Sequence, residues 1–389
     1  FMKVIFLEWN SFGNADILEA FSDLGREVIR YPFSNKIDRT DAVFENALET
    51  RIRQCQPDYI FSFNYFPAVA LVCKKTDIPY ISWVYDSPYV QIFSYTIIFP
   101  CNHIFVFDKE LCMEFWKAGV TTIHYLPMAA NPKRLDTLTD FSALAQSGLM
   151  PETGIAFIGS MYTESHQFYD RLTGISPYTR GYLEGIMAAQ KHVYGYNFIE
   201  EVLPPEIIED MKRSLPMEPN ADGVETIQYL FAQYVINRRI TGMERQELLT
   251  AIGEKYPLDV YTPDSRLKLP GAVNHGTADY YQMAPMIFKK ARINLNISLR
   301  SIKSGIPLRA FDIMGAGGFL LSNFQADFLD GFIPGEDFEY FESRQDLLDK
   351  INYYLSHEEE RAAIAKNGHH KVASAHTYIH RIKEMESAL

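Results

Sequence analysis

The amino-acid sequence predicts an α/β protein with two domains, each built around a parallel sheet that helices cover on both faces. The chain has 389 residues, and chains of this length usually form two or three domains of roughly 100–200 residues each. Short apolar runs alternate along it with segments whose apolar residues recur at helical spacing. This alternation is typical of parallel strands that are joined by crossover helices.

The first domain is expected over residues 2–135. Its first strand covers residues 3–9, and a helical pattern follows over residues 17–24. Further apolar runs predict strands over residues 27–31, 59–63, 80–85, 103–107 and 122–126. Polar residues at the ends of three strands should meet at the carboxyl edge of the sheet, where open α/β sheets bind ligands. These residues, which would face an acceptor, are Glu8, Asn10, Asn64 and Asp86.

The second domain is expected over residues 150–370, after a polar stretch at residues 136–148. Its strands are predicted over residues 154–159, 258–262, 293–297 and 319–322. A mostly helical segment, at about residues 165–255, forms an insertion at the start of this domain. Near the end of the chain, Gly368 fits the C-terminal stop of a helix.

Composition and charge exclude several classes of function. The 37 lysines and arginines are outnumbered by 49 acidic residues, so the net charge is −12 and nucleic-acid binding is not expected. The four cysteines lack C-x-x-C spacing, which favours free thiols in a reducing cytoplasm. No signal-peptide pattern is visible, and the most apolar stretch, residues 80–107, is broken by Asp86, Pro88 and Pro100. We therefore expect a soluble cytoplasmic protein without a transmembrane segment.

Metal and dinucleotide motifs are also missing from the sequence. No histidine or carboxylate grouping has metal-ligand spacing, and there is no Asp-x-Asp element, so no metal and no cofactor is expected. The glycines at residues 315–318 end a helix and lack the third glycine of a nicotinamide fingerprint, because Leu320 stands in its place.

The most informative segment follows the third predicted strand of the second domain. A polar loop carries Arg300, Lys303, Ser304 and Gly305, and Pro307 stands where a helix would begin. Amides at a helix start, with the macrodipole behind them, are suited to a diphosphate, and the basic side chains would be counter-charges.

Arg309 and Asp312 follow on one face of that helix. A carboxylate there is able to accept hydrogen bonds from the vicinal hydroxyls of a ribose, as in dinucleotide-binding folds. The alternative interpretation is an ordinary surface ion pair between the two side chains.

Other candidates lie at strand ends. Gly159 would let the backbone approach a phosphate, with the Ser160 hydroxyl as a donor. Tyr261 and Thr262 would lie near the base of a nucleotide. Asp86 is the candidate general base for an acceptor hydroxyl, although its Asp-Ser-Pro context is also that of a capped turn.

The loop and helix described above resemble the donor-binding part of group-1 glycosyltransferases, and in particular of the spore-maturation (CgeB-like) glycosyltransferases. That family carries the pattern G-x-P-x-R-x-F-[DE]-x-x-x-x-G, which is matched here by Gly305, Pro307, Arg309, Phe311, Asp312 and Gly317. The resemblance covers residues 154–376 and includes the segments 157–160 and 376–381. Through residues 83–88, the first half resembles the domain of unknown function that precedes the transferase domain in such proteins.

This resemblance implies the GT-B fold, in which two Rossmann-like domains face a cleft. It implies a bacterial, metal-independent, hexosyltransferase-type enzyme with a nucleotide-sugar donor and a protein or glycan acceptor, and a C-terminal helix over residues 371–389 that crosses back to the first domain. Asp312 would take the place of the second acid of an E-x7-E motif, which holds the ribose. The first acid falls at Ser304, which is not a carboxylate, so the identity of the sugar does not carry over. Arg309, with Arg300 or Lys303, would stabilise the leaving diphosphate.

Two alternatives remain open at this point. The same architecture also serves a sugar-nucleotide epimerase, which needs no acceptor. A non-catalytic partner subunit that has kept the fold is the other alternative, and the missing acid at Ser304 favours it.

Overall fold

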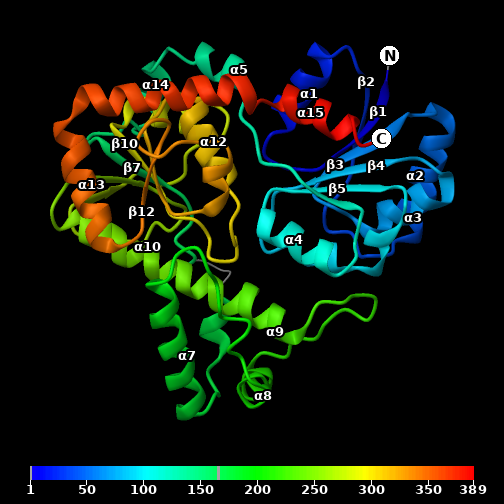
Figure 1. The fold of residues 1–389 in the computed structure, drawn as a ribbon, viewed down its shortest axis with the longest axis horizontal. Coiled ribbons are helices and arrows are strands. Elements are labelled where there is room, and N and C mark those ends of the chain that lie inside the picture. The colour runs from blue at the N-terminus through cyan, green and yellow to red at the C-terminus, as the bar shows by residue number, and fades with distance from the viewer. Residues whose placement is uncertain (1, 164–166) are drawn as a thin grey trace.

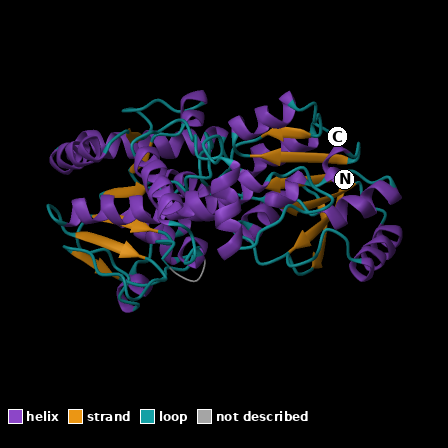
Figure 2. Ribbon diagram, turned by 90° about the horizontal axis from the view of Figure 1, so that it is seen from below, coloured by secondary structure: helices purple, strands orange, loops and turns teal. Residues whose placement is uncertain are grey.

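The structure, a computed structural model, describes residues 2–163 and 167–389 of the chain. These residues form two six-stranded sheets, one in each of two lobes that lie side by side (Figure 1). In both lobes helices enclose the strands (Figure 2). The predicted fold class, α/β with two Rossmann-like domains, is confirmed.

The sheet of the N-terminal lobe is parallel and has the strand order β2-β1-β3-β4-β5-β6. Its strands are β1 (Lys3–Glu8), β2 (Glu27–Pro32), β3 (Tyr59–Phe63), β4 (Tyr80–Val84), β5 (Asn102–Val106) and β6 (Ile123–Tyr125). Its helices are α1 (Asn14–Asp23), α2 (Ala42–Cys55), α3 (Pro67–Thr76) and α4 (Lys109–Lys117), with 3-10 turns at Val90–Phe93 and Tyr95–Ile98. The strand order reverses between β1 and β3, which marks the usual ligand position in such a sheet.

The sheet of the C-terminal lobe is also parallel, with the order β12-β11-β10-β7-β8-β9. Its strands are β7 (Ile155–Ile158), β8 (Leu258–Tyr261), β9 (Ala272–Asn274), β10 (Ile293–Asn296), β11 (Leu320–Asn323) and β12 (Glu339–Phe341). Counted within the lobe, this is the Rossmann order 3-2-1-4-5-6, and it reverses between β7 and β10. The short strands β9 and β12 lie at the two edges and have no counterpart among the predicted strands.

The helices of the C-terminal half surround this sheet and continue beyond it. They are α5 (Pro132–Thr137), α6 (Ser142–Gln146), α7 (Pro177–Lys191), α8 (Pro205–Ser214), α9 (Ile227–Leu230), α10 (Asn237–Gly253), α11 (Met283–Lys290), α12 (Leu308–Gly315), α13 (Arg344–Ser356), α14 (Glu358–Ala375) and α15 (Tyr378–Glu386). A π-helix at Phe231–Ile236 joins α9 to α10, and 3-10 turns lie at Phe168–Arg171 and Ala326–Asp330. Helix α12 begins one residue after Pro307, which is its N-cap and not its first residue as expected.

The segment expected as one helix over residues 371–389 is divided. Helix α14 ends at Ala375 and α15 begins at Tyr378, because Thr377 caps the new helix with its side chain. Helix α15 lies against α1 of the N-terminal lobe (Figure 1). Glu386 near its end pairs with Arg26 at 2.6 Å and accepts a hydrogen bond from the Tyr59 hydroxyl at 2.8 Å.

Gly368 does not end a helix, contrary to expectation. It lies inside α14, where an added Cβ would be 2.3 Å from the carbonyl oxygen of Asp337. A glycine is needed there because a neighbouring loop packs directly on the helix backbone.

The helical insertion extends below the C-terminal sheet and has its own apolar cluster (Figure 1). The loop between α8 and α9 reaches the N-terminal lobe. There Asp222 and Glu225 pair with the Arg39 guanidinium at 3.0 and 3.2 Å, and the Val224 amide donates to the carbonyl of Phe93 at 2.9 Å. The insertion therefore links the two lobes.

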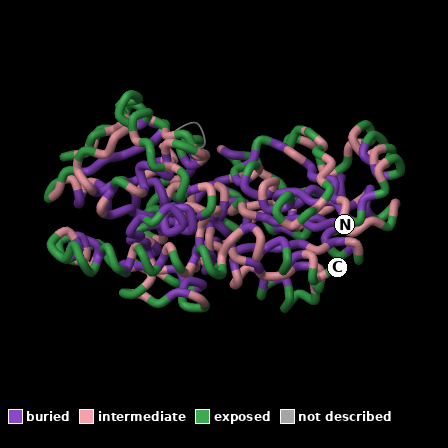
Figure 3. The backbone as a smooth tube through the Cα atoms, turned by 90° about the horizontal axis from the view of Figure 1, so that it is seen from above, coloured by how far each residue is buried: buried purple, intermediate pink, exposed green. Residues whose placement is uncertain are grey.

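A second contact between the lobes, which we call the clasp, consists of Asp108, Glu110, Lys303 and Ser304. The Asp108 carboxylate, at the N-cap of α4, accepts hydrogen bonds from the amides of Lys303 and Ser304 at 2.6 and 3.3 Å and from the Ser304 hydroxyl at 3.1 Å. In return, the Ser304 hydroxyl accepts the Glu110 amide at 2.9 Å. Buried residues lie inside both lobes (Figure 3), and one cluster of buried apolar residues has members from each of them.

Replacing Asp108 with alanine is expected to lower the free energy of unfolding by about 2–3 kcal/mol, because buried donors of both lobes lose their acceptor. Urea denaturation measures the change. Asp330→Ala is the matched control: Asp330 contacts the neighbouring Lys109 at the surface, where an ion pair is worth roughly 0–1 kcal/mol. Equal losses for both variants would contradict the clasp.

Candidate active site between the lobes

A cavity of about 400 Å³ lies between the lobes, at the carboxyl ends of both sheets. This volume lies in the roughly 300–1,000 Å³ range of small-molecule sites. The N-terminal lobe lines it with loop residues after β1 and β4, namely Phe12, Tyr85, Asp86 and Ser87. The C-terminal lobe lines it with Ile158, Tyr162, Arg245, Ala278, Tyr280, Ala284, Phe288, Asn296, Ser298, Leu299, Ile302, Pro307, Leu308, Arg309 and Asp312. The residues at the ends of β7 and β10 place the cavity at the strand-order reversal of the C-terminal sheet.

Arg309 lies in the first turn of α12 and lines this cavity. A Cβ atom on Gly159 would lie 3.2 Å from its Nη2 atom, so the glycine at the end of β7 makes room for the guanidinium. In the described part of the chain, Arg309 forms no hydrogen bond or ion pair. Burial and the nearby Arg245 lower the pKa of Arg309 to about 10, so it remains a cation at neutral pH. The cavity therefore contains a positive charge that no anion among the described residues neutralises by an ion pair.

Asp312 lies about one turn further along α12 and is only 7% exposed. The Tyr280 hydroxyl donates to its Oδ1 atom at 3.3 Å. Burial, together with the nearby Asp16, raises the pKa of Asp312 to about 8. The structure brings Arg309 and Asp312 together on the cavity wall, as the sequence predicts, and they do not form a surface ion pair.

Asp86 lines the opposite wall, directly after β4. The Asn64 side chain donates to its Oδ2 atom at 2.7 Å. Burial raises the pKa of Asp86, whereas the hydrogen bond from Asn64 and the charge of Arg238 act in the opposite direction. Asp86 thus faces the C-terminal lobe across the cavity, while Asn64 lies behind it and is not a lining residue.

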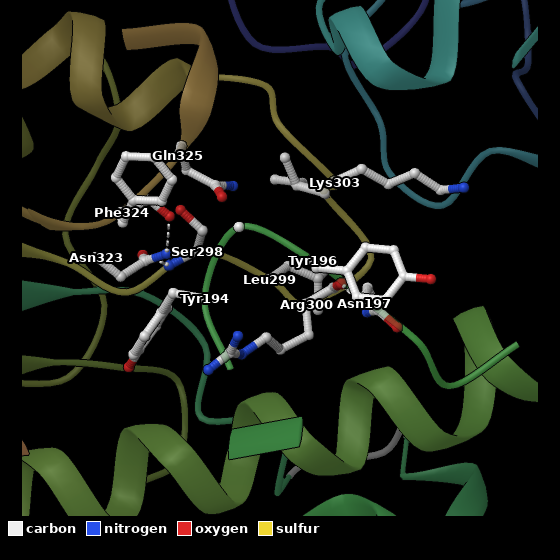
Figure 4. Close-up of a pocket in the computed structure, with 12 residues that line it drawn as sticks. Tyr194, Tyr196, Asn197, Ser298, Leu299, Arg300, Lys303, Asn323, Phe324 and Gln325 are labelled. Atoms are coloured by element: carbon white, nitrogen blue, oxygen red, sulfur yellow. Dashed lines mark hydrogen bonds between the residues drawn. The ribbon is translucent and has the colours of Figure 1, made fainter. Parts of the chain in front are cut away.

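Arg300 has a different role from the one expected. Its guanidinium pairs with Glu244 at 2.7 Å, donates to the carbonyls of Val193 and Lys191 at 2.8 and 3.1 Å, and lies over the ring of Tyr194. Figure 4 shows that it extends in the opposite direction from Lys303, in a small pocket beside the cavity. The structure does not support a contact between Arg300 and the nucleotide-sugar, because groups of the insertion accept the hydrogen bonds of its guanidinium.

The loop residues Lys303, Ser304 and Gly305 contact the N-terminal lobe. The Lys303 ammonium pairs with Glu114, and the Ser304 amide belongs to the clasp. A Cβ atom on Gly305 would lie 2.8 Å from the ring of Phe107. The expectation that these residues hold a diphosphate is therefore corrected: contacts between the lobes occupy them.

Three more donor-side candidates lie outside the cavity lining. The Tyr261 hydroxyl donates to the carbonyl of Leu149 at 2.7 Å, and Thr262 is fully buried next to it. The Ser160 hydroxyl accepts the amide of Tyr162 at 3.0 Å. These groups shape the ends of β7 and β8, and the structure does not support direct contact with a nucleotide.

On the acceptor side, Glu8 and Asn10 were expected at the cavity, but neither residue lines it. Glu8 forms a bidentate ion pair with Arg30 on the adjacent strand β2, at 2.6 and 2.7 Å. Asn10 is exposed and is not among the residues that line the cavity.

Two residues that line the cavity, Arg245 and Tyr280, were not expected from the sequence. Arg245 comes from α10 of the insertion, is 3% exposed, and donates to the carbonyl of Ser160 at 2.6 Å. The ring of Tyr280 lies 4.9 Å from that of Phe12, so the two lobes meet at this aromatic contact. Neither residue belongs to a recognisable motif, because each is brought to the cavity from a segment distant in sequence.

Comparison with known proteins agrees with this geometry. Residues 238–387 match the family model described as glycosyl transferase-like. A glycosyltransferase from Rickettsia africae ESF-5 has a similar structure, with 11% identity and a TM-score of 0.53, over 99% of this chain and 97% of that one. Sucrose-phosphate synthase from Thermosynechococcus elongatus also has 11% identity and a TM-score of 0.53, over 100% of this chain and 99% of that one.

Anabaena HepE in complex with UDP-glucose has 12% identity and a TM-score of 0.55 over 100% of both chains. No curated protein sequence matches this chain. The chain thus has the GT-B fold of glycosyltransferases, and its C-terminal part matches the glycosyl transferase-like family.

Membrane-spanning helices and metal-binding clusters of side chains are both absent from the residues that the structure describes. None of the helices they form is long and apolar enough to cross a membrane. Within residues 2–163 and 167–389, no group of three or more His, Cys, Asp or Glu side chains is arranged to hold a metal ion.

Proposed function

We propose that the protein is a glycosyltransferase that moves a hexosyl-type sugar from a nucleoside diphosphate to an acceptor hydroxyl, without a metal ion. The observation that carries this proposal is that the Arg309 guanidinium, which forms no ion pair with the described residues, and the buried Asp312 carboxyl group lie on the same wall of the inter-lobe cavity. Anabaena HepE, which shares the fold, forms a complex with UDP-glucose, and this supports a donor of the same class.

The diphosphate would bind at the start of α12. The amides of Leu308 and Arg309 begin this helix, where no preceding helical carbonyl is available to them, and they lie at the positive end of its dipole. The Arg309 guanidinium supplies the counter-charge. As the sugar leaves, negative charge develops on the diphosphate, and preformed donors of this kind stabilise it.

The nucleoside would lie further along the same wall. Ionised Asp312 is able to accept hydrogen bonds from both vicinal hydroxyls of a ribose. Apolar side chains beside it offer a surface for a planar base, and these are Ile158, Ala278, Ala284 and Phe288.

The acceptor, a protein or a glycan, would enter from the N-terminal lobe, with Asp86 as the general base. Replacing Asp86 with asparagine is expected to slow transfer by roughly 10²-fold or more, since general base catalysis commonly contributes 10²–10⁴-fold. Nucleotide affinity should stay unchanged, because Asp86 lies on the opposite wall. Single-turnover kinetics together with calorimetry separate the two quantities. Transfer at the wild-type rate in a folded variant would exclude Asp86 as the base.

A thermal-shift panel of nucleoside diphosphates and nucleotide-sugars tests the donor site. A ligand present at about 100 times its Kd stabilises the folded state by about 2.7 kcal/mol. We expect one nucleotide series to raise the Tm of the wild type and to have little effect on Asp312→Ala. If no nucleotide protects the protein, the non-catalytic alternative replaces the proposal. Product analysis without an acceptor distinguishes transfer from epimerisation.

We also place the protein in the bacterial cytoplasm, among the spore-maturation-like (CgeB-like) transferases. Its four cysteines are all free thiols in the structure, which fits a reducing compartment. The motif residues Gly305, Pro307, Arg309, Phe311 and Asp312 support the assignment to this group. Fractionation of the native host measures the location directly.

A further inference from the structure

Asn64 is a buried polar residue whose side-chain oxygen and nitrogen both form hydrogen bonds within the protein. It follows β3 at the strand-order reversal of the N-terminal sheet and is 2% exposed. Its φ of 59° is in the left-handed region, which asparagine tolerates better than most residues. The backbone is held on both sides: the Asn64 amide donates to the Trp83 carbonyl at 2.8 Å, and its carbonyl accepts the Ser62 hydroxyl at 2.6 Å.

The side chain of Asn64 holds the segment that carries the proposed base. Its Oδ1 atom accepts the amides of Tyr85 and Asp86, at 3.1 and 3.3 Å. Its Nδ2 atom donates to Oδ2 of Asp86 at 2.7 Å. One amide group thus fixes both the backbone and the carboxylate of the same residue.

The two oxygens of Asp86 are consequently different. Oδ2 is bound by Asn64, whereas Oδ1 has no hydrogen-bond partner in the described part of the chain. Asp86 lines the cavity and Asn64 does not. The structure thus places Asn64 behind Asp86 and not at the cavity wall, contrary to its expected acceptor-side role.

We propose that Asn64 is the positioning residue of the transfer reaction, which holds Oδ2 of Asp86 and leaves Oδ1 to take the acceptor proton. This inference rests on the proposed glycosyl transfer. In that step the acceptor oxygen bonds to the anomeric carbon, the bond from this carbon to the diphosphate oxygen breaks, and the acceptor proton moves to Oδ1. The diphosphate leaves with the bonding electrons, and Asp86 later returns the proton to water.

The charge balance at Asp86 agrees with this role. The protein surroundings raise the pKa of Asp86, and the hydrogen bond from Asn64 opposes that increase. A donor that binds the ionised carboxylate favours the form that is active as a base. Removing it should move the pH at which activity appears to a higher value.

Asn64→Asp and Asn64→Gly test the proposal. The aspartate keeps the shape and the acceptor oxygen but replaces the donor with a like charge, which raises the pKa of Asp86. The glycine tolerates the left-handed backbone and deletes the side chain. In both variants we expect kcat/KM at pH 7 to fall about 10–100-fold and the acid limb of its pH profile to move up by about one unit. The affinity for nucleotide should not change.

Asn46→Asp, the same change of charge at an exposed position of α2, is the control and should leave the profile unaltered. A purely structural role of Asn64 would lower the Tm and the rate without moving the acid limb, and this outcome would overturn the proposal.

A carbon-13 NMR titration of the Asp86 carboxyl, assigned with Asp86→Asn, needs no turnover. If the Asp86 titration is the same in the wild type and in both Asn64 variants, the inference fails even where transfer is established. If the titration moves but no nucleotide-sugar reacts, the proposed function fails and the Asn64–Asp86 coupling remains.

Discussion

Replacing Arg309 with alanine is expected to slow sugar transfer by about 10²–10³-fold, the usual effect of removing one preformed donor from a developing anion. The reason is that Arg309 lines the cavity and that no described residue neutralises it by an ion pair. Its pKa of about 10 keeps it charged over the working range. Because the charge on the diphosphate grows as the bond breaks, the loss should fall mainly on kcat and less on nucleotide affinity.

Rapid-quench measurement of a single turnover, with calorimetry of nucleoside diphosphate binding, checks this result. Arg309→Lys should restore only part of the rate, since an ammonium does not reproduce the planar fork of a guanidinium. Arg266→Ala removes an exposed arginine from the same lobe and should have no effect on transfer. If Arg309→Ala turned over at the wild-type rate and bound nucleotide normally, the donor site would not be at the start of α12.

Replacing Asp312 with asparagine is expected to weaken nucleotide binding by at least 10-fold, because the amide offers one acceptor atom where the carboxylate offers two. The binding should also lose its dependence on pH. With a pKa of about 8 in the free protein, Asp312 is mostly protonated at pH 7, and ribose hydroxyls favour its ionised form. The affinity of the wild type should therefore increase from pH 7 to pH 9, while that of Asp312→Asn stays constant.

The same substitution should stabilise the protein at high pH. The pKa of Asp312 is raised above its ordinary value of 3.8, so the folded state holds this proton more tightly than the unfolded state. The stability from this group is present below pH 4 and is lost as the pH rises toward 8. At pH 8 we expect Asp312→Asn to unfold at a higher urea concentration than the wild type. Asp349→Asn, at an exposed position of α13, is the control. Lower stability of Asp312→Asn at pH 8, or affinity that falls with pH in the wild type, would contradict the assignment.

Local patterns were sufficient for the central strands of both sheets, but not for the short edge strands β9 and β12. Buried parallel strands are near-continuous apolar runs, and this signal depends only on neighbours in sequence. The runs at residues 59–63 and 293–297 therefore correspond closely to β3 and β10. Gly368 shows the limit of such reasoning, because the carbonyl of Asp337, a residue of another segment, determines why a glycine is there.

The same distinction between local and distant contacts applies to the candidate site. Arg309 and Asp312 share a helix, so their relation on the cavity wall depends on helix geometry alone and could be anticipated. Arg300, Lys303 and Ser304 lie in the adjacent loop and looked equally suitable. Their partners are Glu244 from the insertion and Glu114 and Asp108 from the other lobe. No local sequence pattern predicts these contacts.

The sequence by itself determined the α/β class, the succession of the central strands, and the face of α12 that carries a cation and an anion. Only the tertiary structure decided which polar side chains remain available to a ligand. The physical reason is that a buried charged or polar group must find a partner wherever the chain supplies one. In this protein the partners of the loop before α12 lie across the junction of the lobes, more than a hundred residues away in sequence for Lys303 and Ser304. Arg309, which has none in the described chain, is left facing the cavity.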